Sequence, residues 1–167
     1  MRLPRSLGAF GMTAVLAVFG GGFVRACATP TATTTNDVLK VATTCTTMVN
    51  KERTARGLKP LAIDSRIQTA AQQHSNYQAR YGKMTHAEPS PRTDAGARMV
   101  IAGYKWSWWG ENVAAGQTSC AQVMSAWMKS PAHKANILKK EFTQIGVAAQ
   151  KTSGGVWFRT MDLGRPR

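Results

Sequence analysis

The chain reads Trp109-Gly110-Glu111-Asn112-Val113-Ala114 near its middle, a mainly apolar run with one carboxylate. The run belongs to a strand that we predict over residues 106–114. Further along, Ser130-Pro131-Ala132-His133-Lys134-Ala135-Asn136-Ile137-Leu138 predicts a short helix, capped by its serine and with proline at its first position. The two segments therefore place Glu111 on a strand and His133 in the first turn of a helix.

A third polar group, His86, lies upstream in the segment 82–92, where two prolines exclude a regular helix. Two imidazoles and one carboxylate can hold a divalent cation while leaving coordination positions open to a ligand. We therefore predict a metal site formed by His86, Glu111 and His133, with zinc as the cation expected first. The alternative is a buried polar network in which Glu111 accepts hydrogen bonds from both imidazoles.

The remaining histidine, His74, has a different environment in the sequence. Apolar residues at helical spacing predict a helix over residues 64–81, with Asp64 as its N-cap and Gly82 after its end. His74 falls on the apolar face of this helix. We therefore expect a hydrogen-bonded core histidine at this position rather than a metal ligand.

Helical periodicity predicts three further helices, over residues 37–56, over residues 93–102 and after Ser119. Two final strands are predicted over residues 143–150 and 155–163, joined by a polar, glycine-containing turn. Helices come first, one strand lies in the middle, and two strands close the chain. This order favours an α+β fold over a parallel α/β sheet.

Several segments, in this order, resemble the CAP superfamily, which comprises cysteine-rich secretory proteins, antigen-5 proteins and plant pathogenesis-related proteins. They are Val49-Asn50-Lys51-Glu52-Arg53, Gly57-Leu58-Lys59-Pro60-Leu61, Gly110-Glu111-Asn112, Ser130-Pro131-Ala132-His133 and the closing runs 142–147 and 156–164. The chain looks like a bacterial-type member, and the resemblance covers residues 38–164. It implies the CAP/SCP fold, a three-layer α-β-α sandwich around a central, mainly antiparallel sheet.

The resemblance also implies how the predicted metal site assembles. Similar proteins build a central cavity lined by two histidines and acidic groups, and the three residues named above would line it here. Many animal and plant relatives carry a second glutamate three residues after a helix tryptophan, whereas this chain has Ser130 at that distance from Trp127. The family pattern further implies that Asn112 holds the strand edge and Asn136 a neighbouring turn.

The N-terminus is typical of a secretory signal peptide, which we place at residues 1–28. A short basic region precedes an apolar, glycine-rich run from Leu7 to Val24. An uncleaved membrane anchor is one alternative, but three consecutive glycines weaken its helix and Arg25 follows at once. A lipobox that would leave Cys27 lipid-modified is another, so we expect a secreted protein or, alternatively, one anchored through that cysteine.

The rest of the chain divides into a Thr/Pro/Ala-rich linker at residues 29–37, one CAP/SCP domain at residues 38–164 and a tail at residues 165–167. The domain contains two cysteines, Cys45 and Cys120, an even number for an oxidising compartment. We therefore predict a disulfide between them. The alternative is a pair of buried free thiols.

The formal net charge is +14, from 22 Lys and Arg residues against 8 Asp and Glu residues. A surface of this sign attracts anionic partners such as anionic lipid or cell-wall polymers, and it permits peripheral contact with a membrane. Nucleic acid is not expected as a partner, because export removes the chain from it and no recognition motif is present.

Three tryptophans, Trp106, Trp108 and Trp109, crowd one short segment. On a regular strand, Trp106 and Trp108 share one face and Trp109 takes the other. We predict a ligand groove formed by Trp106 and Trp108, suited to a sterol, an acyl chain or a sugar ring. Relatives in the resembled family bind sterols and fatty acids. The alternative is that all three indoles pack in the core.

These features predict an exported protein that acts chiefly by binding, with a lipid, a sterol or a cell-surface polymer as its partner. The alternative is a metal-assisted extracellular hydrolase, either a protease or a cell-wall enzyme, in which the bound metal activates water. The chain has neither a Gly-x-Ser-x-Gly nor a His-Glu-x-x-His segment, so this alternative depends on the metal site alone. We therefore expect binding rather than catalysis.

Overall fold

The computed structural model describes residues 35–167. The predicted signal peptide, most of the predicted linker and Cys27 lie outside the described residues. Within residues 35–167, no helix combines the length and the apolar character that crossing a membrane requires.

Five helices and four strands alternate irregularly along the described part of the chain. The helices are α1 (Thr35–Thr54), α2 (Ser65–Tyr81), α3 (Ala95–Ile101), α4 (Cys120–Lys129) and α5 (Pro131–Leu138). The strands are β1 (Ala62–Ile63), β2 (Trp106–Ala115), β3 (Gln144–Lys151) and β4 (Trp157–Pro166).

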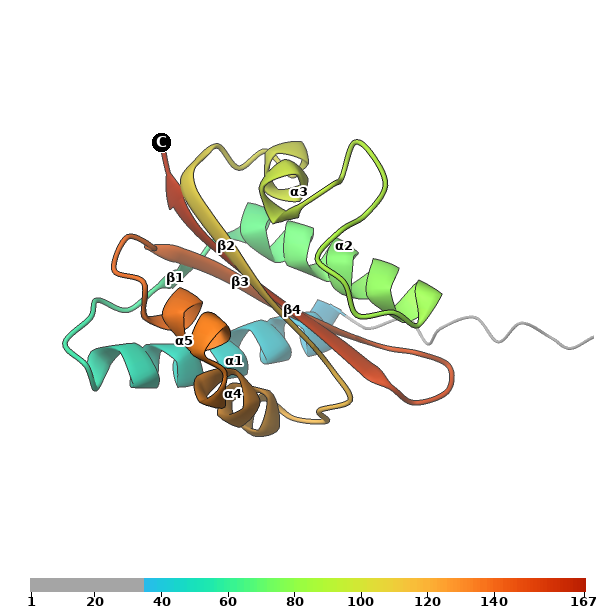
Figure 1. Cartoon of the computed structure of the whole chain (residues 1–167), viewed down its shortest axis with the longest axis horizontal. Helices are drawn as coiled ribbons and strands as arrows, with labels where there is room; N and C mark the ends of the chain where they lie inside the picture. The colour runs from blue at the N-terminus through green and yellow to red at the C-terminus, as the bar shows by residue number, and fades with distance from the viewer. Residues whose placement is uncertain (1–34) are drawn as a thin grey trace, which may run out of the picture.

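The strands form one sheet in the order β1-β3-β4-β2, so β2 is an edge strand. The pairs β3–β4 and β4–β2 are antiparallel, and only the two-residue strand β1 pairs in parallel, with β3. Helices α2 and α3 cover one face of the sheet, and α1, α4 and α5 cover the other (Figure 1). The predicted α+β class and the three-layer sandwich are confirmed.

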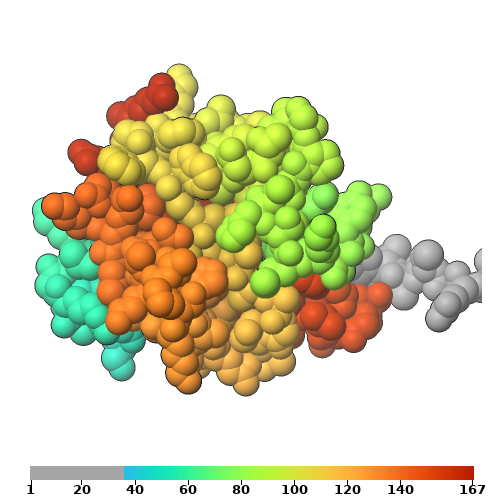
Figure 2. Space-filling model, viewed as in Figure 1, coloured from blue at the N-terminus to red at the C-terminus, as the bar shows by residue number. Residues whose placement is uncertain are grey.

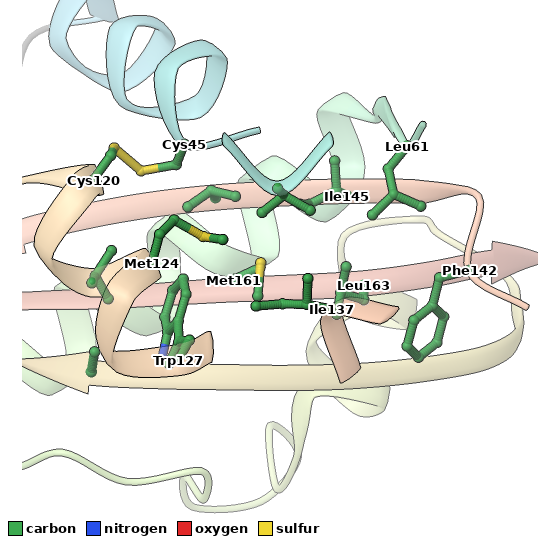
Figure 3. Packing of buried hydrophobic residues seen from close by; sticks show 14 residues of the cluster. Cys45, Leu61, Cys120, Met124, Trp127, Ile137, Phe142, Ile145, Met161 and Leu163 are labelled. Carbon is green, nitrogen blue, oxygen red and sulfur yellow. A yellow bond between two sulfur atoms is a disulfide. The ribbon is translucent and has the colours of Figure 1, made fainter. Parts of the chain in front are cut away.

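Each face of the sheet has its own hydrophobic core. The larger core lies between β3, β4 and the helices α1, α4 and α5, and it contains Trp127, Ile137 and the cysteine pair (Figure 3). The smaller core joins α2 and α3 around Ile67 and Met99. Because both faces are covered, β4 is buried along most of its length, polar residues included.

Helix α2 approaches the sheet very closely at Gly146 of β3. A Cβ atom at this glycine would lie 2.4 Å from the backbone nitrogen of Gln68 and 2.5 Å from the carbonyl carbon of Ile67. The side chain of Gln68 bonds to the backbone of Val147 on both sides, donating to its oxygen and accepting from its nitrogen. These contacts fix the position of α2, and with it the site that α2 helps to form.

The ends of the helices follow the predicted caps in most cases. Asp64 caps α2 by accepting from the backbone nitrogens of its first turn, and Gly82 ends the helix in the left-handed conformation at φ 62°. Ser119 caps α4 through its side chain. Ser130 occupies the predicted N-cap position of α5, but its side chain makes no capping hydrogen bond.

Most element boundaries differ from the prediction by one to three residues. Helix α1 begins at Thr35, so residues 35–37 of the predicted linker are helical. Strand β4 extends to Pro166 rather than 163, because it continues to pair with the start of β2, and the hydroxyl of Ser107 donates to the carbonyls of Arg165 and Pro166. Strand β1 was not predicted, since two residues are too short to produce a periodicity.

The predicted disulfide between Cys45 and Cys120 is present and joins α1 to α4, with the two Cα atoms 5.2 Å apart. Both cysteines are buried in the larger core (Figure 3). A cross-link over 75 residues restricts the unfolded chain strongly. On the chain-entropy model, this bond stabilises the fold by roughly 4 kcal/mol.

Replacing both cysteines by alanine should therefore lower the free energy of unfolding by roughly 4 kcal/mol in urea denaturation. Adding reductant to the wild type should produce a similar loss, and adding it to the double variant should produce none. An unfolding midpoint of the double variant equal to that of the wild type would show that the bond contributes nothing to stability.

Candidate functional site

Glu111 is the centre of a buried polar cluster on the face of the sheet that α2 and α3 cover. Its side chain is only 3% exposed, and its two oxygens have different partners. One oxygen lies 2.7 Å from Nδ1 of His86. The other accepts a hydrogen bond from Nη2 of Arg98 and lies 3.7 Å from Nε2 of His74. The carboxylate is thus surrounded by cationic or donor groups from three segments.

Arg98 links the loop between α2 and α3 to β2. Its side chain is fully buried, comes from α3, and pairs with Glu111. A second nitrogen, Nη1, donates to the backbone oxygen of His86 at 3.0 Å. The guanidinium therefore holds His86 by its backbone while Glu111 holds it by its ring. Arg98 was not predicted as a site residue from the sequence. Its position inside a short apolar helix was the one feature of the sequence that could have indicated a buried arginine.

His74 has the environment that its apolar helix face predicted, and this prediction is confirmed. The ring is fully buried, with Nδ1 2.6 Å from Glu88 and Nε2 2.7 Å from the backbone oxygen of Thr85. Burial raises the pKa of Glu88, but hydrogen bonds from Arg92 and His74 outweigh burial and hold that pKa below its ordinary value. Both nitrogens of His74 are thus engaged in holding the loop.

A second carboxylate, Asp162, lies directly beside Glu111, because the two residues are partners in the register of β2 and β4. Asp162 is completely buried, and this burial, together with the negative charge of Glu111, raises its pKa well above the ordinary value. Burial therefore favours the protonated form of Asp162. It was not predicted, because a carboxylate in a strand normally indicates an exposed position.

The two histidines of the predicted site differ in exposure and charge. The side chain of His86 is 61% exposed, and its hydrogen bond to Glu111 raises its pKa although partial burial opposes the shift. His133, in the first turn of α5, is half-buried, and burial followed by the charge of His86 lowers its pKa. The two shifts therefore run in opposite directions.

Two asparagines position His133 against the edge of the sheet. The amide of Asn112 donates to the backbone oxygen of His133 at 3.0 Å. The amide of Asn136 donates to the side chain of Asn112 at 2.9 Å and to the backbone oxygen of Glu111 at 3.1 Å. The family pattern implied that Asn112 holds the strand edge and Asn136 a turn, whereas here Asn136 donates to the strand and Asn112 donates to α5.

The three predicted ligands do not form one ligand set in this arrangement. Among residues 35–167, no group of three or more His, Cys, Asp or Glu side chains is disposed to hold a metal ion. Glu111 already bonds His86 and Arg98, so a cation beside it would face the guanidinium. His86 uses Nδ1 for Glu111, which leaves Nε2 for a cation. A cation here would therefore depend on the imidazoles of His86 and His133, with Glu111 orienting the first of them.

The tryptophans do not divide between the faces of β2 as predicted. The register of β2 against β4 shifts between Trp106 and Trp108. Trp106 therefore meets Trp109, with ring centroids 6.2 Å apart, while Trp108 lies beneath the ammonium group of Lys139 at 4.3 Å. The prediction that Trp106 and Trp108 share a face is wrong, because one irregular residue reverses the side of every residue beyond it.

Trp106 and Trp109 instead line a surface groove of about 410 Å³ between β2 and α3, which we call the α3–β2 groove. Its other walls come mainly from the aliphatic side chains of Val100 and Ile101, which are 54% and 51% exposed. The indole nitrogen of Trp106 donates to the backbone oxygen of Gly96 at 3.0 Å, which fixes that ring at the groove. The groove is therefore apolar and open to solvent.

The family model of the cysteine-rich secretory protein family, CAP, matches residues 46–160 of the chain. The protein YkwD of Bacillus subtilis (strain 168) is 36% identical over 110 residues, which make up 66% of this chain and 42% of that protein. The chain thus spans less than half the length of this relative.

Two solved structures share the fold at low sequence identity. An outer surface protein from Borrelia burgdorferi superposes with a TM-score of 0.73 at 19% identity, over 83% of this chain and 100% of that one. An extracellular protein containing an SCP domain from Bacillus anthracis superposes with a TM-score of 0.66 at 22% identity, over 80% of this chain and 44% of that one.

The ion pair of Arg98 and Glu111 should be essential for stability, because removing either partner leaves the other charged and buried. We expect Arg98→Met or Glu111→Gln to lower the free energy of unfolding by about 3–5 kcal/mol each. The double variant should lose much less than the sum of the two, as measured in a double-mutant cycle by urea denaturation.

The matched control is Arg56→Met, which breaks an exposed ion pair with Glu52. Exposed pairs contribute at most about 1 kcal/mol, so this variant should stay close to the wild type. If Arg98→Met costs no more than Arg56→Met, the buried pair does not hold the site together.

Proposed function

Because the chain belongs to the cysteine-rich secretory protein (CAP) family, we propose that it is an exported protein that acts by binding an amphipathic lipid. The ligand is a sterol or a fatty acyl chain, taken up at an anionic membrane surface. The observation that carries the proposal is the α3–β2 groove, where two indoles and two exposed aliphatic side chains line an open hollow.

The composition of the groove supports an apolar ligand. Among its lining residues only Asp94 has a charged side chain, and that carboxylate caps α3 by accepting from the backbone nitrogen of Ala97. A volume of about 410 Å³ falls within the range of small-molecule sites. Val100 and Ile101 are 54% and 51% exposed, so burying the exposed part of either side chain against a ligand contributes about 1 kcal/mol. A lipid tail gains this energy, whereas a sugar would leave its hydroxyls unpaired.

The surroundings of the groove support contact with a membrane surface. Lys105 and Arg167 are exposed at the start of β2, where the side chain of Arg167 donates to the backbone oxygen of Trp106. Indoles and cations beside exposed aliphatic residues suit the interface of an anionic bilayer. Export is supported by the N-terminal sequence and by similar structures described as an outer surface protein and an extracellular protein.

Binding is favoured over metal-assisted hydrolysis by the contacts of Glu111. A hydrolase of the predicted kind needs a carboxylate that is free to hold a metal or to accept a proton from water. Both oxygens of Glu111 are already bonded, to His86 and to the buried Arg98. We therefore assign this carboxylate a positioning role.

We propose as a second function that His86 and His133 bind a divalent cation, of which zinc suits imidazole nitrogen best. The observation that favours it is the hydrogen bond between Glu111 and Nδ1 of His86, the carboxylate–histidine arrangement that orients metal-binding imidazoles. A bound cation would supply a Lewis acid or an anchor for an anionic ligand. With only two imidazoles from the protein, binding is expected to be weak and exchangeable.

Lipid binding predicts that Ile101→Ser and Trp109→Ala each weaken the affinity for the fluorescent sterol dehydroergosterol about fivefold, because each removes about 1 kcal/mol of apolar contact. Energy transfer from tryptophan and competition by a fatty acid provide the measurement. Melting temperatures check that the variants are folded.

The matched control is Val156→Ser, which removes a comparably exposed apolar residue beyond the other end of β4. It should bind like the wild type. Trp108→Ala should also leave sterol affinity unchanged, since that indole is outside the groove. Equal losses in all four variants, or no binding by the wild type, would contradict the proposal.

The cation proposal predicts that zinc raises the melting temperature of the wild type. At a zinc concentration 100 times the Kd, the stabilisation would be about 2.7 kcal/mol. His86→Ala and His133→Ala should each abolish the shift, whereas the exposed Lys83→Ala should retain it. A shift of equal size in His86→Ala would exclude direct ligation by that residue.

A further inference from the structure

A second groove, which we call the basic groove, lies at the end of the molecule where α1 ends and β3 begins. It has a volume of about 730 Å³ and is lined by residues 57–60, residues 140–143 and Arg165. These segments are far apart in the sequence. In Figure 2 the teal segment that follows α1, the orange segment before β3 and the dark red C-terminal segment come together at the left of the molecule.

The basic groove concentrates positive charge. Lys59, Lys140 and Arg165 are all exposed and all line it, and the only acidic residue in its lining is Glu141. Within residues 35–167, none of the three cations is part of an ion pair with a carboxylate. Three like charges around one hollow repel one another, so the arrangement favours an anionic ligand that would offset the repulsion.

A buried arginine explains how the cations stay together. Arg53, at the end of α1, is only 1% exposed and donates to the backbone oxygens of Lys59 at 2.9 Å, Lys139 at 2.9 Å and Phe142 at 3.3 Å. Both walls of the groove are thus bonded to one guanidinium inside the protein. Because the backbone of both walls is held, little backbone entropy is lost when a ligand binds.

An exposed indole stands next to these cations. Trp108 is 46% exposed and is the register partner of Arg165 across β2 and β4, so both side chains project from the same face of the sheet. The ammonium group of Lys139 lies 4.3 Å from the centre of the Trp108 ring and 5.9 Å from that of Phe142, which lines the groove. Lys139 therefore connects the indole to the groove.

We propose that the basic groove binds a linear anionic glycan of a cell surface. Lys59, Lys140 and Arg165 would contact its carboxylate, sulfate or phosphate groups, and Trp108 would pack against the apolar face of a sugar ring. This site is separate from the α3–β2 groove, and it does not depend on lipid binding there.

The shape of the site favours a polymer chain over a bilayer. A concave groove of this size admits a narrow chain, whereas a flat membrane surface would touch only its rim. The exposed aliphatic pair Val100 and Ile101, which a bilayer would bury, lines the other groove. An indole beside several cations instead matches a ligand that alternates sugar rings with anionic groups.

The proposal is tested with the full chain and polygalacturonate, with neutral dextran as the uncharged comparison, by isothermal titration calorimetry at several salt concentrations. The wild type should bind polygalacturonate and not dextran.

Lys140→Gln combined with Arg165→Gln should weaken binding to polygalacturonate at least tenfold and flatten its salt dependence, because fewer ionic contacts are screened. Trp108→Ala should weaken binding about tenfold with the salt dependence retained. Lys59→Gln, an exposed single change, should weaken it to a smaller extent.

The matched control is Lys40→Gln combined with Lys83→Gln, which removes the same charge elsewhere. Lys40 lies near the start of α1, roughly 20 Å from the groove, and Lys83 lies beyond the far end of α2, roughly 25 Å away. This variant should bind within twofold of the wild type. An equal loss in the control would mean that binding depends on net charge alone, and it would contradict a specific site at the basic groove.

The alternative ligand is a membrane surface. If vesicles of phosphatidylglycerol bind as well as polygalacturonate and lose binding in the Lys140/Arg165 variant, the surface contacts membranes and the glycan proposal is wrong.

Discussion

The buried ion pair between Arg98 and Glu111 is the interaction on which the polar face of the molecule depends. Taking two charges out of water costs several kcal/mol per ion, so the pair is tolerated only with further hydrogen bonds. Arg98 supplies one to the backbone of His86, and Glu111 meets the ring of the same histidine. Beside Glu111, burial and the charge of that carboxylate raise the pKa of Asp162, which disfavours a second buried negative charge. The loop between α2 and α3 is consequently held at the sheet, although it contains no helix or strand of its own.

The sequence predicted helix ends, buried residues and strands correctly where the residues nearby in the chain carried the signal. Asp64 and Gly82 bracket α2, and the apolar face between them correctly placed His74 in the core. The two final strands followed from equally local patterns, and the cysteine pair followed from the number of cysteines in the domain. The direction of Trp106 could not be predicted, because the shift in register depends on how β2 meets β4. Arg98 was missed for a related reason: a buried guanidinium makes sense only beside its acidic partners, and these come from other segments.

Strand β2 separates two grooves of opposite character. The side chains of Trp109 and Glu111 project towards α3. The side chains of Trp108 and Asn112, and the side of the strand on which Gly110 would carry a Cβ atom, face α5 and the segment before β3. The first side therefore combines an apolar groove with a buried ion pair, and the second combines an exposed indole with surface cations. A single edge strand can serve both sides because its residues alternate. Gly110 is needed for this arrangement, since a Cβ atom there would lie 2.9 Å from the ring of Phe142.

An edge strand also exposes peptide groups that can pair with another chain, and β2 is protected against this by side chains rather than by a further strand. The indole nitrogen of Trp127 donates to the carbonyl of Val113 at 3.2 Å, and the amide of Asn136 donates to that of Glu111 at 3.1 Å. These two donors come from α4 and α5, so closing the edge also positions α5. Helix α5 carries His133 in its first turn and is followed at once by Lys139. The contacts that cover these two carbonyls therefore also place the imidazole of one candidate site and the ammonium group of the other.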